Sequence, residues 1–443
     1  MVRIRPFLTA YDPSDLPGGS IDPLGFERGY LHLADKILPG MTNVAACPRY
    51  FGILCAGAHL AETDDDAPPR EIARNRREAI LRLERLWALA NVLAYGEEDG
   101  ALSELRGVTY ARRQAEALSN NGGTRADSDF KFLSRQAPYG VLGIYGAVAE
   151  SAHLIYRRTY DLTPGLGLPL AESFCTETSM PSGIRRAIRD DADVSLSTLR
   201  AWGENAWLWG KSGKQEKRLL SEMLHGEPVR SRFCQVLSRQ TVVDGENELQ
   251  RLQRIASVLK SSDSNLDLWE SVEMVIRYEE CYQLAMLMIE RLLFLCRNRA
   301  DPSGSLSIAD VESDSVVLSV MTALPLTVES LLNHAGQCQT EHFRSGLDRL
   351  SDVLQFLELA AASCGSTTEL VAAVLSRHTD TQHGKFDRGR RKMPWIQSMD
   401  DKLSLTMTRV GGLKTEAVLP EHITPHPYRL HAADNWLRAA GEI

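Results

Sequence analysis

The stretch EIARNRREAILRLERLWALANVL, from Glu71 to Leu93, indicates the fold class of this 443-residue chain. Its apolar residues recur at spacings of three and four, while arginine and glutamate fill the opposite face, which is the pattern of an amphipathic α-helix. The apolar positions are Ile80, Leu83, Leu86, Trp87, Ala90 and Leu93. We therefore expect a long helix here, with one face in a core.

The same periodicity predicts helices elsewhere in the chain, while strand patterns are scarce. The further predicted helices span 248–259, 269–296, 343–361 and 368–375. Ser366 or Thr367 is the expected N-cap of the last one. The best alternating patterns lie at 402–410 and 229–233. The protein is therefore predicted to be mostly α-helical and multi-domain, with at most a small β-hairpin near the C-terminus.

Breaks in composition suggest three consecutive domains. A chain of this length exceeds the roughly 100–200 residues typical of one domain. The runs LTPGLGLPL around Pro164 and RADPSGSLS around Pro302 are rich in the residues that punctuate structure. The predicted helical domains are 1–165, with an irregular Pro- and Gly-rich opening, 166–300, and 301–443, which carries a basic segment at 377–392.

The composition is that of a soluble protein in a reducing compartment. Hydrophobic residues make up 43% of the chain and charged ones 24%, and the net charge of −8 means that any contact with nucleic acid must be local. The eight cysteines include no C-x-x-C pair, which fits reduced thiols. The N-terminus lacks the apolar run of a secretory signal, and the apolar stretch 275–296 carries charges that are costly in lipid. We expect a cytoplasmic protein without membrane contact.

The sequence contains no complete motif for common nucleotide-binding or hydrolytic chemistry. Gly210-Lys211-Ser212 resembles the end of a phosphate-binding loop, but Asn205 stands where that loop requires a glycine. The patterns G-x-S-x-G and H-E-x-x-H are also missing from the sequence. No cofactor is therefore expected.

Two groups of histidines have spacings that resemble metal sites. His334, Cys338 and His342 recur every four residues, so adjacent pairs can chelate zinc, but one straight helix does not readily close three such ligands around a tetrahedral ion. A second group consists of His422, His426 and His431. Prolines among these residues break the helix that would align them. We expect no metal at either place.

The stretch SRHTDTQHGKFDRGRRKMPW (376–395) concentrates positive charge in an otherwise acidic chain. Between Arg377 and Lys392, six cationic residues stand against two acidic ones, a net charge of +4. Such an excess can neutralise phosphates, and interleaved side chains such as Phe386 can stack on bases. The candidate nucleic-acid contacts are Arg377, Lys385, Arg388, Arg390, Arg391, Lys392 and Trp395. The alternative is a solvated turn that covers the end of a helix.

A catalytic alternative uses the start of the same stretch. Arg377, His378 and His383 fit the R-x(4–6)-H pattern, and in this respect the chain resembles HEPN-type ribonucleases. In that chemistry a histidine exchanges a proton with the attacking hydroxyl, while a guanidinium stabilises charge on the phosphate. The pattern is short, and Gly384 follows it directly.

Short motifs near both ends of the chain carry a family resemblance. They are Pro23-Leu24-Gly25, Leu38-Pro39-Gly40 with Thr42, Arg49-Tyr50-Phe51, Lys392 with Pro394-Trp395, and Tyr428-Arg429-Leu430. In these motifs the chain resembles bacterial helical proteins of unknown function whose genes recur in phage-defence and restriction-type clusters. The resemblance implies no active site. From the residues alone, we expect the Tyr50 and Phe51 rings to be buried and Arg49 to cap carbonyls or pair with an acid such as Asp35.

Together these features predict a non-catalytic nucleic-acid-binding or assembly component of a bacterial phage-defence or DNA-processing system. The basic segment would contact DNA or RNA, and the acidic remainder would face other protein subunits. Two alternatives remain open: a ribonuclease that uses Arg377, His378 and His383, and a protein-binding scaffold that does not contact nucleic acid.

Overall fold

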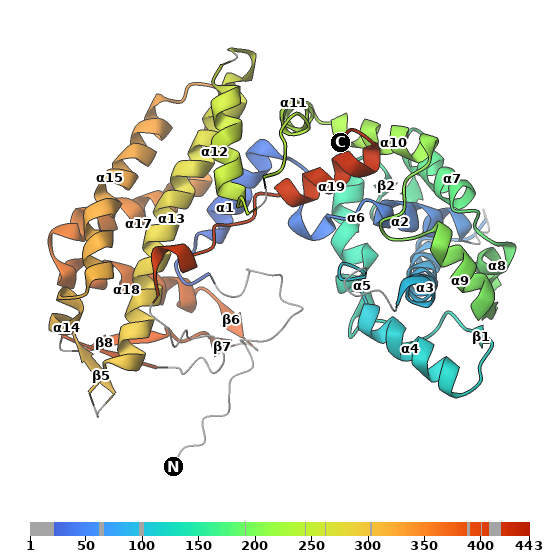
Figure 1. Ribbon diagram of the computed structural model, residues 1–443, viewed down its shortest axis with the longest axis horizontal. Helices are drawn as coiled ribbons and strands as arrows, with labels where there is room; N and C mark the ends of the chain where they lie inside the picture. Colours follow the sequence, from blue (N-terminus) through green and yellow to red (C-terminus); the bar gives the residue numbers. More distant parts are fainter. Residues whose placement is uncertain are drawn as a thin grey trace. The chain divides into compact units, whose positions relative to one another are not determined.

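The structure is a computed structural model, and the residues it describes form nineteen α-helices and nine short β-strands (Figure 1). The described residues are 22–61, 66–96, 102–190, 192–243, 245–261, 263–301, 304–387, 390–399, 401–406 and 418–443. They divide into two units, each built from two parts of the chain. Unit 1 combines Met1–Ile37 with Val242–Tyr428, and unit 2 combines Leu38–Thr241 with Arg429–Ile443.

Unit 1 is organised around one long central helix. Its helices are α1 (Glu27–Ile37), α12 (Glu248–Leu259), α13 (Leu266–Asn298), α14 (Ile308–Glu312), α15 (Ser315–Gln337), α16 (Glu341–Arg344), α17 (Ser351–Ala362) and α18 (Thr367–His383). Its strands are β5 (Ser305–Ser307), β6 (Phe386–Asp387), β7 (Arg390–Arg391), β8 (Ile396–Met399) and β9 (Lys402–Leu405). The central helix α13 packs against α1, α12 and α15 (Figure 1). Strands β5, β9 and β8 form an antiparallel sheet in that order.

Unit 2 is organised around helix α2, which is almost entirely buried. Its helices are α2 (Arg49–Leu60), α3 (Pro69–Tyr95), α4 (Val108–Asn120), α5 (Gln136–Tyr139), α6 (Val141–Ser151), α7 (Gly167–Glu177), α8 (Ser182–Asp190), α9 (Leu196–Asn205), α10 (Lys214–His225), α11 (Pro228–Leu237) and α19 (Leu430–Ala440). Two antiparallel pairs join β1 (Arg125–Ala126) to β4 (Val194–Ser195) and β2 (Ile155–Tyr156) to β3 (Asp161–Leu162).

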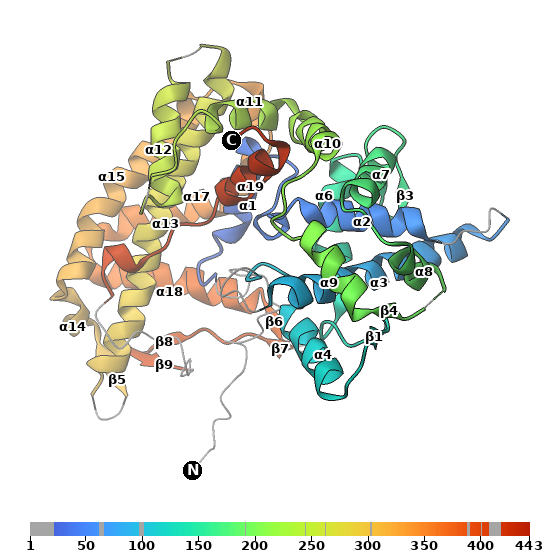
Figure 2. The same cartoon turned by 45° about the vertical axis from the view of Figure 1, so that its right-hand side comes forward.

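Close packing of α2 on α3 forms the core of unit 2 (Figure 2). Every residue of α2 except His59 is buried. A Cβ atom on Gly57 of α2 would lie 2.6 Å from the Cα atom of Ile80 in α3, so a glycine is needed where the two backbones meet. On the same helix, the Trp87 indole donates a hydrogen bond to the Ala206 carbonyl at 2.5 Å. The apolar stripe read from the sequence is therefore the buried face of α3.

The predicted fold class, mostly α-helical with a small C-terminal hairpin, is confirmed. The predicted helices 71–93, 248–259 and 269–296 correspond to α3, α12 and α13. The single helix predicted at 343–361 is wrong in its continuity, because the chain turns at Gly346, whose φ is +80°. A 3₁₀ turn at Leu347–Leu350 then leads into α17.

Two other boundaries differ from the sequence-based prediction. Helix α18 begins after the N-cap Ser366 and continues to His383, well beyond residue 375. The strand predicted at 229–233 is wrong, because these residues lie in α11. Glu227 caps that helix by accepting the Arg230 N–H at 2.6 Å, and Pro228 occupies its first turn. Of the strand predicted at 402–410, β9 covers the first four residues, and residues 407–410 lie outside the described part.

The two observed units do not coincide with the three consecutive segments 1–165, 166–300 and 301–443. The chain changes unit at 37/38, 241/242 and 428/429, so each unit collects segments that are distant in sequence. The Pro- and Gly-rich run around Pro164 lies inside unit 2, where the Gly167 N–H donates to the Thr163 hydroxyl at 3.1 Å. It forms a tight turn before α7 instead of an interdomain linker.

One described helix, α15, is long and apolar enough to cross a membrane by length and composition alone. It packs against α13 and α17, and 33% of its apolar window is buried. A single helix of this kind is weak evidence for a membrane span, because core helices of soluble proteins pass the same test. All eight cysteines are free thiols, and seven of them are buried.

Candidate functional site

The basic segment begins on α18, where Arg377 is bound within unit 1. Its Nε–H donates to the Leu24 carbonyl at 2.7 Å. Its two terminal nitrogens donate to the two carboxylate oxygens of Asp352 at 2.9 and 2.7 Å, a bidentate ion pair that lowers the pKa of Asp352. The guanidinium also lies over the Phe356 ring, and only 13% of the Arg377 side chain is exposed. Arg377 therefore has a structural role in this unit.

His378 is fully buried, and both of its ring nitrogens have partners. The Trp395 backbone N–H donates to Nε2 at 2.8 Å, so the proton of the neutral ring is on Nδ1. That Nδ1–H donates to the Pro23 carbonyl at 3.0 Å. Burial lowers the pKa of His378 to about 4, so the ring is neutral at pH 7.

Lys385 completes a row of donors along one short piece of backbone. Its ammonium group donates to the Asp22 carbonyl, and burial lowers the pKa of this lysine. The three successive carbonyls of residues 22–24 thus accept hydrogen bonds from Lys385, His378 and Arg377. The first half of the basic segment holds the turn before α1.

The turn before α1 also depends on its own sequence. The Asp22 carboxylate accepts the N–H groups of Gly25, Phe26 and Glu27 at 2.8 to 3.0 Å, which caps the start of the helix. Gly25 has a φ of +76°, and a Cβ atom there would lie 2.9 Å from a terminal nitrogen of Arg377. The Pro23-Leu24-Gly25 motif near the N-terminus and the basic segment near the C-terminus therefore bind each other within unit 1.

Among the described cations of the basic segment, those that face solvent lie on the antiparallel pair of β6 and β7 and on its flanks. We call residues 385–393 the basic hairpin. Arg391 is exposed and pairs across the hairpin with Phe386, whose side chain is 65% exposed. Lys392 is half-buried and Met393 is 50% exposed. Arg388 and the side chain of Arg390 lie outside the described part of the structure.

The seven candidate nucleic-acid contacts thus fall into separate groups. Arg377 and Lys385 are used within the fold, and Trp395 packs on the His378 ring at a centroid distance of 5.0 Å. Arg391 and Lys392 remain at the surface. The expected single patch of cations is therefore reduced, in the described residues, to the basic hairpin.

The ribonuclease alternative receives no support from this geometry. Arg377 is occupied by Asp352, and His378 has no free ring nitrogen, while His383 lies exposed in the last turn of α18. A general base and a phosphate-binding cation must both reach the substrate. Two of the three proposed groups are instead committed to backbone and carboxylate partners.

The histidines with metal-like spacing are also used structurally. Helix α15 ends at Gln337, so His342 does not continue the face that carries His334. The His334 Nε2–H donates to the Glu270 carbonyl at 2.9 Å, and the His342 Nε2–H donates to the Lys36 carbonyl at 2.9 Å. In the described ranges, no three His, Cys, Asp or Glu residues are grouped as a metal site.

Of the second histidine group, His426 has the most structured surroundings. Its Nδ1–H and backbone N–H donate to the buried Glu279 carboxylate at 2.7 and 2.9 Å, and the Tyr428 hydroxyl donates to the same group at 2.6 Å. A histidine oriented by a carboxylate resembles a general base. Here the ring is stacked on Tyr30 and lies 4.0 Å from the Tyr282 centroid, so it anchors this segment to α13.

His422 and His431 have unrelated partners. The His422 ring accepts the Leu419 N–H at 3.2 Å, and His431 lies 3.3 Å from the Glu104 carboxylate. These two histidines and His426 therefore make three separate sets of contacts.

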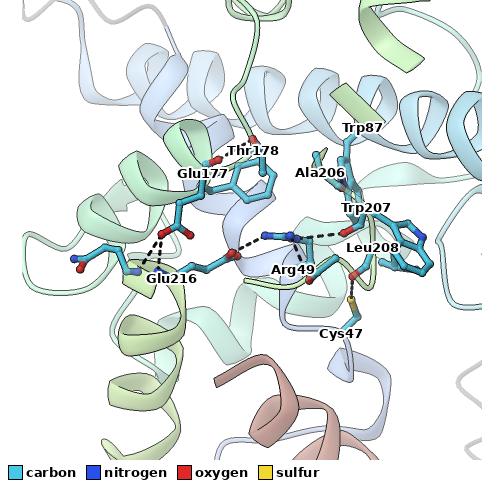
Figure 3. A network of polar contacts seen from close by, with 12 residues as sticks. Cys47, Arg49, Trp87, Glu177, Thr178, Ala206, Trp207, Leu208 and Glu216 are labelled. Atoms are coloured by element: carbon cyan, nitrogen blue, oxygen red, sulfur yellow. Dashed lines mark hydrogen bonds and ion pairs between the residues drawn. The ribbon is translucent and has the colours of Figure 1, made fainter. Parts of the chain in front are cut away.

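Arg49 lies at the centre of a buried network in unit 2 (Figure 3). It forms a 2.6 Å ion pair with Glu216 and donates to the carbonyls of Trp207 and Gly210 at 3.3 and 3.4 Å. The rings of the neighbouring Tyr50 and Phe51 are buried, as predicted. The guanidinium binds carbonyls and an acid, as predicted, but the acid is Glu216, on α10, and not Asp35.

In the motifs Leu38-Pro39-Gly40 and Tyr428-Arg429-Leu430, buried arginines also donate hydrogen bonds to, or lie within, the motif backbone. The Leu38 carbonyl accepts a hydrogen bond from Arg429 at 2.9 Å, and the Pro39 carbonyl accepts one from Arg230 at 2.8 Å. Both arginines are buried. Sequence reasoning missed Asp352, Glu216 and Arg230 as partners, because each lies far along the chain from the group that it binds. Only the Asp22 cap had a local signal, an aspartate just before a helix.

No model of a known protein family, no curated protein and no solved structure matches this chain. The family resemblance drawn from the end motifs therefore stays a prediction.

Proposed function

We propose that this protein is a non-catalytic component of a bacterial assembly and that it binds nucleic acid through the basic hairpin. The observation that carries the proposal is the pairing of Arg391 with Phe386 on an exposed two-stranded hairpin. A cation beside an exposed ring suits a single strand, whose phosphates meet the charge while a base stacks on the ring.

The base of the basic hairpin is fixed, which favours binding. Lys385 is tied to the Asp22 carbonyl, the Lys392 N–H donates to the Lys385 carbonyl at 3.0 Å, and Trp395 is tied to His378. A surface held in one conformation loses less entropy when a ligand binds. The buried cations thus support the exposed ones.

The assembly is a phage-defence or DNA-processing system in the cytoplasm. This part of the proposal is supported by the resemblance of the end motifs and by the reduced, mostly buried cysteines. Because the net charge is −8, the rest of the surface is suited electrostatically to protein partners that carry basic patches.

Fluorescence anisotropy with labelled single-stranded DNA and RNA tests the hairpin. The variant Arg391→Gln/Lys392→Gln is expected to weaken binding several-fold at low salt. It should lower the slope of log K against log salt by about 1.4, since each lost single-strand phosphate contact removes about 0.7.

The matched control is Lys260→Gln/Arg344→Gln, which removes one exposed lysine and one exposed arginine elsewhere in unit 1. It should bind like the wild type. If both variants lose affinity equally, the net charge of the protein, and not the basic hairpin, explains the weaker binding. If the wild type retains no DNA or RNA at low salt, nucleic-acid binding is wrong and the scaffold alternative replaces it.

A further inference from the structure

A groove rich in arginine lies in unit 2, away from every residue assigned above. Its volume is about 640 Å³, within the range of ligand sites in proteins. The lining residues are Pro68, Arg70, Glu71, Ala73, Arg74, Arg77, Arg158 and Tyr160. Four arginines against one glutamate give this lining a net charge of +3 in a chain whose total is −8.

Three of the arginines come from the first turns of α3. Arg70, Arg74 and Arg77 are four and three residues apart, so they line one face of the helix over about 10 Å at a rise of about 1.5 Å per residue. The buried residues of α3 begin only at Ala79, so these turns extend beyond the core. The row is longer than a single phosphate and fits a chain of phosphates.

Three of these four arginines are available to a ligand, whereas Arg77 is half-buried and forms an ion pair with Glu78 at 3.0 Å. Arg70, Arg74 and Arg158 are exposed. Among the described residues, Arg74 forms an ion pair with Glu71 at 3.0 Å, and 65% and 48% of the two side chains are exposed. Such a solvent-exposed pair contributes little, so a phosphate can replace Glu71 at small cost. This differs from Arg377, whose side chain is enclosed by protein.

The second wall of the groove is held in place by an arginine that does not line it. Arg76 donates to the Thr159 carbonyl at 3.3 Å and forms an ion pair with Asp161, which ties the β2–β3 hairpin to α3. The turn of that hairpin supplies Arg158 and Tyr160. The two walls of the groove are therefore held in place before any ligand arrives, and the tyrosine adds an aromatic surface for a base.

We infer that this groove binds the phosphodiester backbone of single-stranded nucleic acid. Guanidinium groups bind phosphate oxygens in a bidentate manner, and a row of about 10 Å is long enough to meet more than one phosphate of a single strand. The inference deepens the proposed function, because it assigns the same ligand class to a second surface in the other unit. It rests on different residues, so the two can fail separately.

The test is an anisotropy titration of the full chain with a labelled 20-nucleotide oligo-dT and an RNA of equal length. The variant Arg70→Gln/Arg74→Gln/Arg158→Gln should raise the Kd at least tenfold at about 50 mM salt. It should also lower the salt slope by about 2, for three lost phosphate contacts at about 0.7 each. Circular dichroism should show an unchanged fold, because the three side chains are exposed.

The matched control is Arg112→Gln/Arg186→Gln/Arg200→Gln, which removes three exposed arginines of unit 2 outside the groove. Its Kd should stay within twofold of the wild type. A groove variant that binds like the wild type, or a control that loses as much, overturns the inference. A second variant, Arg158→Glu, changes only the wall formed by the β2–β3 hairpin and leaves the residues of α3 unchanged. It should weaken binding more than Arg112→Glu does.

The hairpin variant Arg391→Gln/Lys392→Gln is titrated in the same series to separate the two assignments. If only the groove variant binds the oligonucleotide more weakly, the groove is a binding site and the basic hairpin is not. If only the hairpin variant binds more weakly, the basic hairpin is a binding site and the groove is not. If the wild type does not bind, both assignments are wrong.

Discussion

Helices α18 and α3 both carry conspicuous arginines, yet the two helices use them differently. Arg377 on α18 is 13% exposed and binds a carboxylate and a carbonyl, whereas Arg74 on α3 is 65% exposed. Helix α18 has buried residues from Thr367 to Gln382, while α3 is buried only from Ala79 onward. The length of a helix that enters the core, rather than the number of its cations, decides which arginines can meet a ligand.

The two helices also bury titratable groups of opposite kind. His378 on α18 is a neutral base whose pKa is lowered to about 4 by burial. Glu84 on α3 is fully buried, and burial raises its pKa to about 7 even though Gln136 and the Val141 N–H donate to its carboxylate. The contrast predicts opposite responses of stability to pH.

The largest expected effect is the loss of stability in acid through His378. Its folded pKa lies below the unfolded value of about 6.5, so the unfolded state binds more protons as the pH falls. Lowering the pH from 7.5 to 4 should cost about 3 kcal/mol through this group. Urea unfolding of wild type and His378→Gln should show this difference in pH dependence, because glutamine can donate and accept without titrating. Parallel pH profiles would contradict the assignment.

Glu84 should act with the opposite sign. Its folded pKa lies above the unfolded value, so the stability it contributes is present below about pH 4.5 and is lost as the pH rises through 7. Relative to the wild type, Glu84→Gln should gain about 3 kcal/mol between pH 4.5 and 8. The same urea series measures the gain, and Glu116→Gln, at an exposed site on α4, serves as the control that should show none.

The third prediction compares one arginine from each region. Arg377→Gln leaves the Leu24 carbonyl and Asp352 without their donor, so the free energy of unfolding should fall by about 2 kcal/mol. Arg70→Gln removes an exposed side chain and should change it by less than about 0.5 kcal/mol. Urea midpoints give both values. Equal effects would mean that burial does not distinguish the two helices.

Much of the helical structure could be predicted from the sequence, because its signals are local. The apolar stripe from Ile80 to Leu93 depends only on spacing within one helix, and so does the Ser366 cap of α18. The break at Gly346 was missed, because a glycine is tolerated in a helix and the apolar spacing continues beyond it. The two-unit division was also missed, since it brings residues 1–37 together with 242–428.

The candidate site was predicted less well, because charge along a sequence does not reveal burial. The count of cations in 377–392 was correct, yet Arg377 and Lys385 bind residues about 350 positions away along the chain. The groove was missed for the same reason: Arg158 lies on the β2–β3 hairpin, more than 80 residues from the arginines of α3, and the contact of Arg76 with that hairpin brings them together. Pairings at such separation leave no periodic signal.

The smallest expected effect comes from an acidic residue near the groove. Glu62, Asp64, Asp65 and Asp66 precede α3 in the sequence, and of these the structure describes only the exposed Asp66. A carboxylate two residues before Pro68 of the groove lining repels an incoming phosphate, so Asp66→Asn should tighten oligo-dT binding about twofold at 50 mM salt. At 200 mM salt the gain should shrink, since added salt screens interactions between exposed charges. A gain of equal size from Glu116→Gln would show that the net charge of the protein, and not the field at the groove, controls binding.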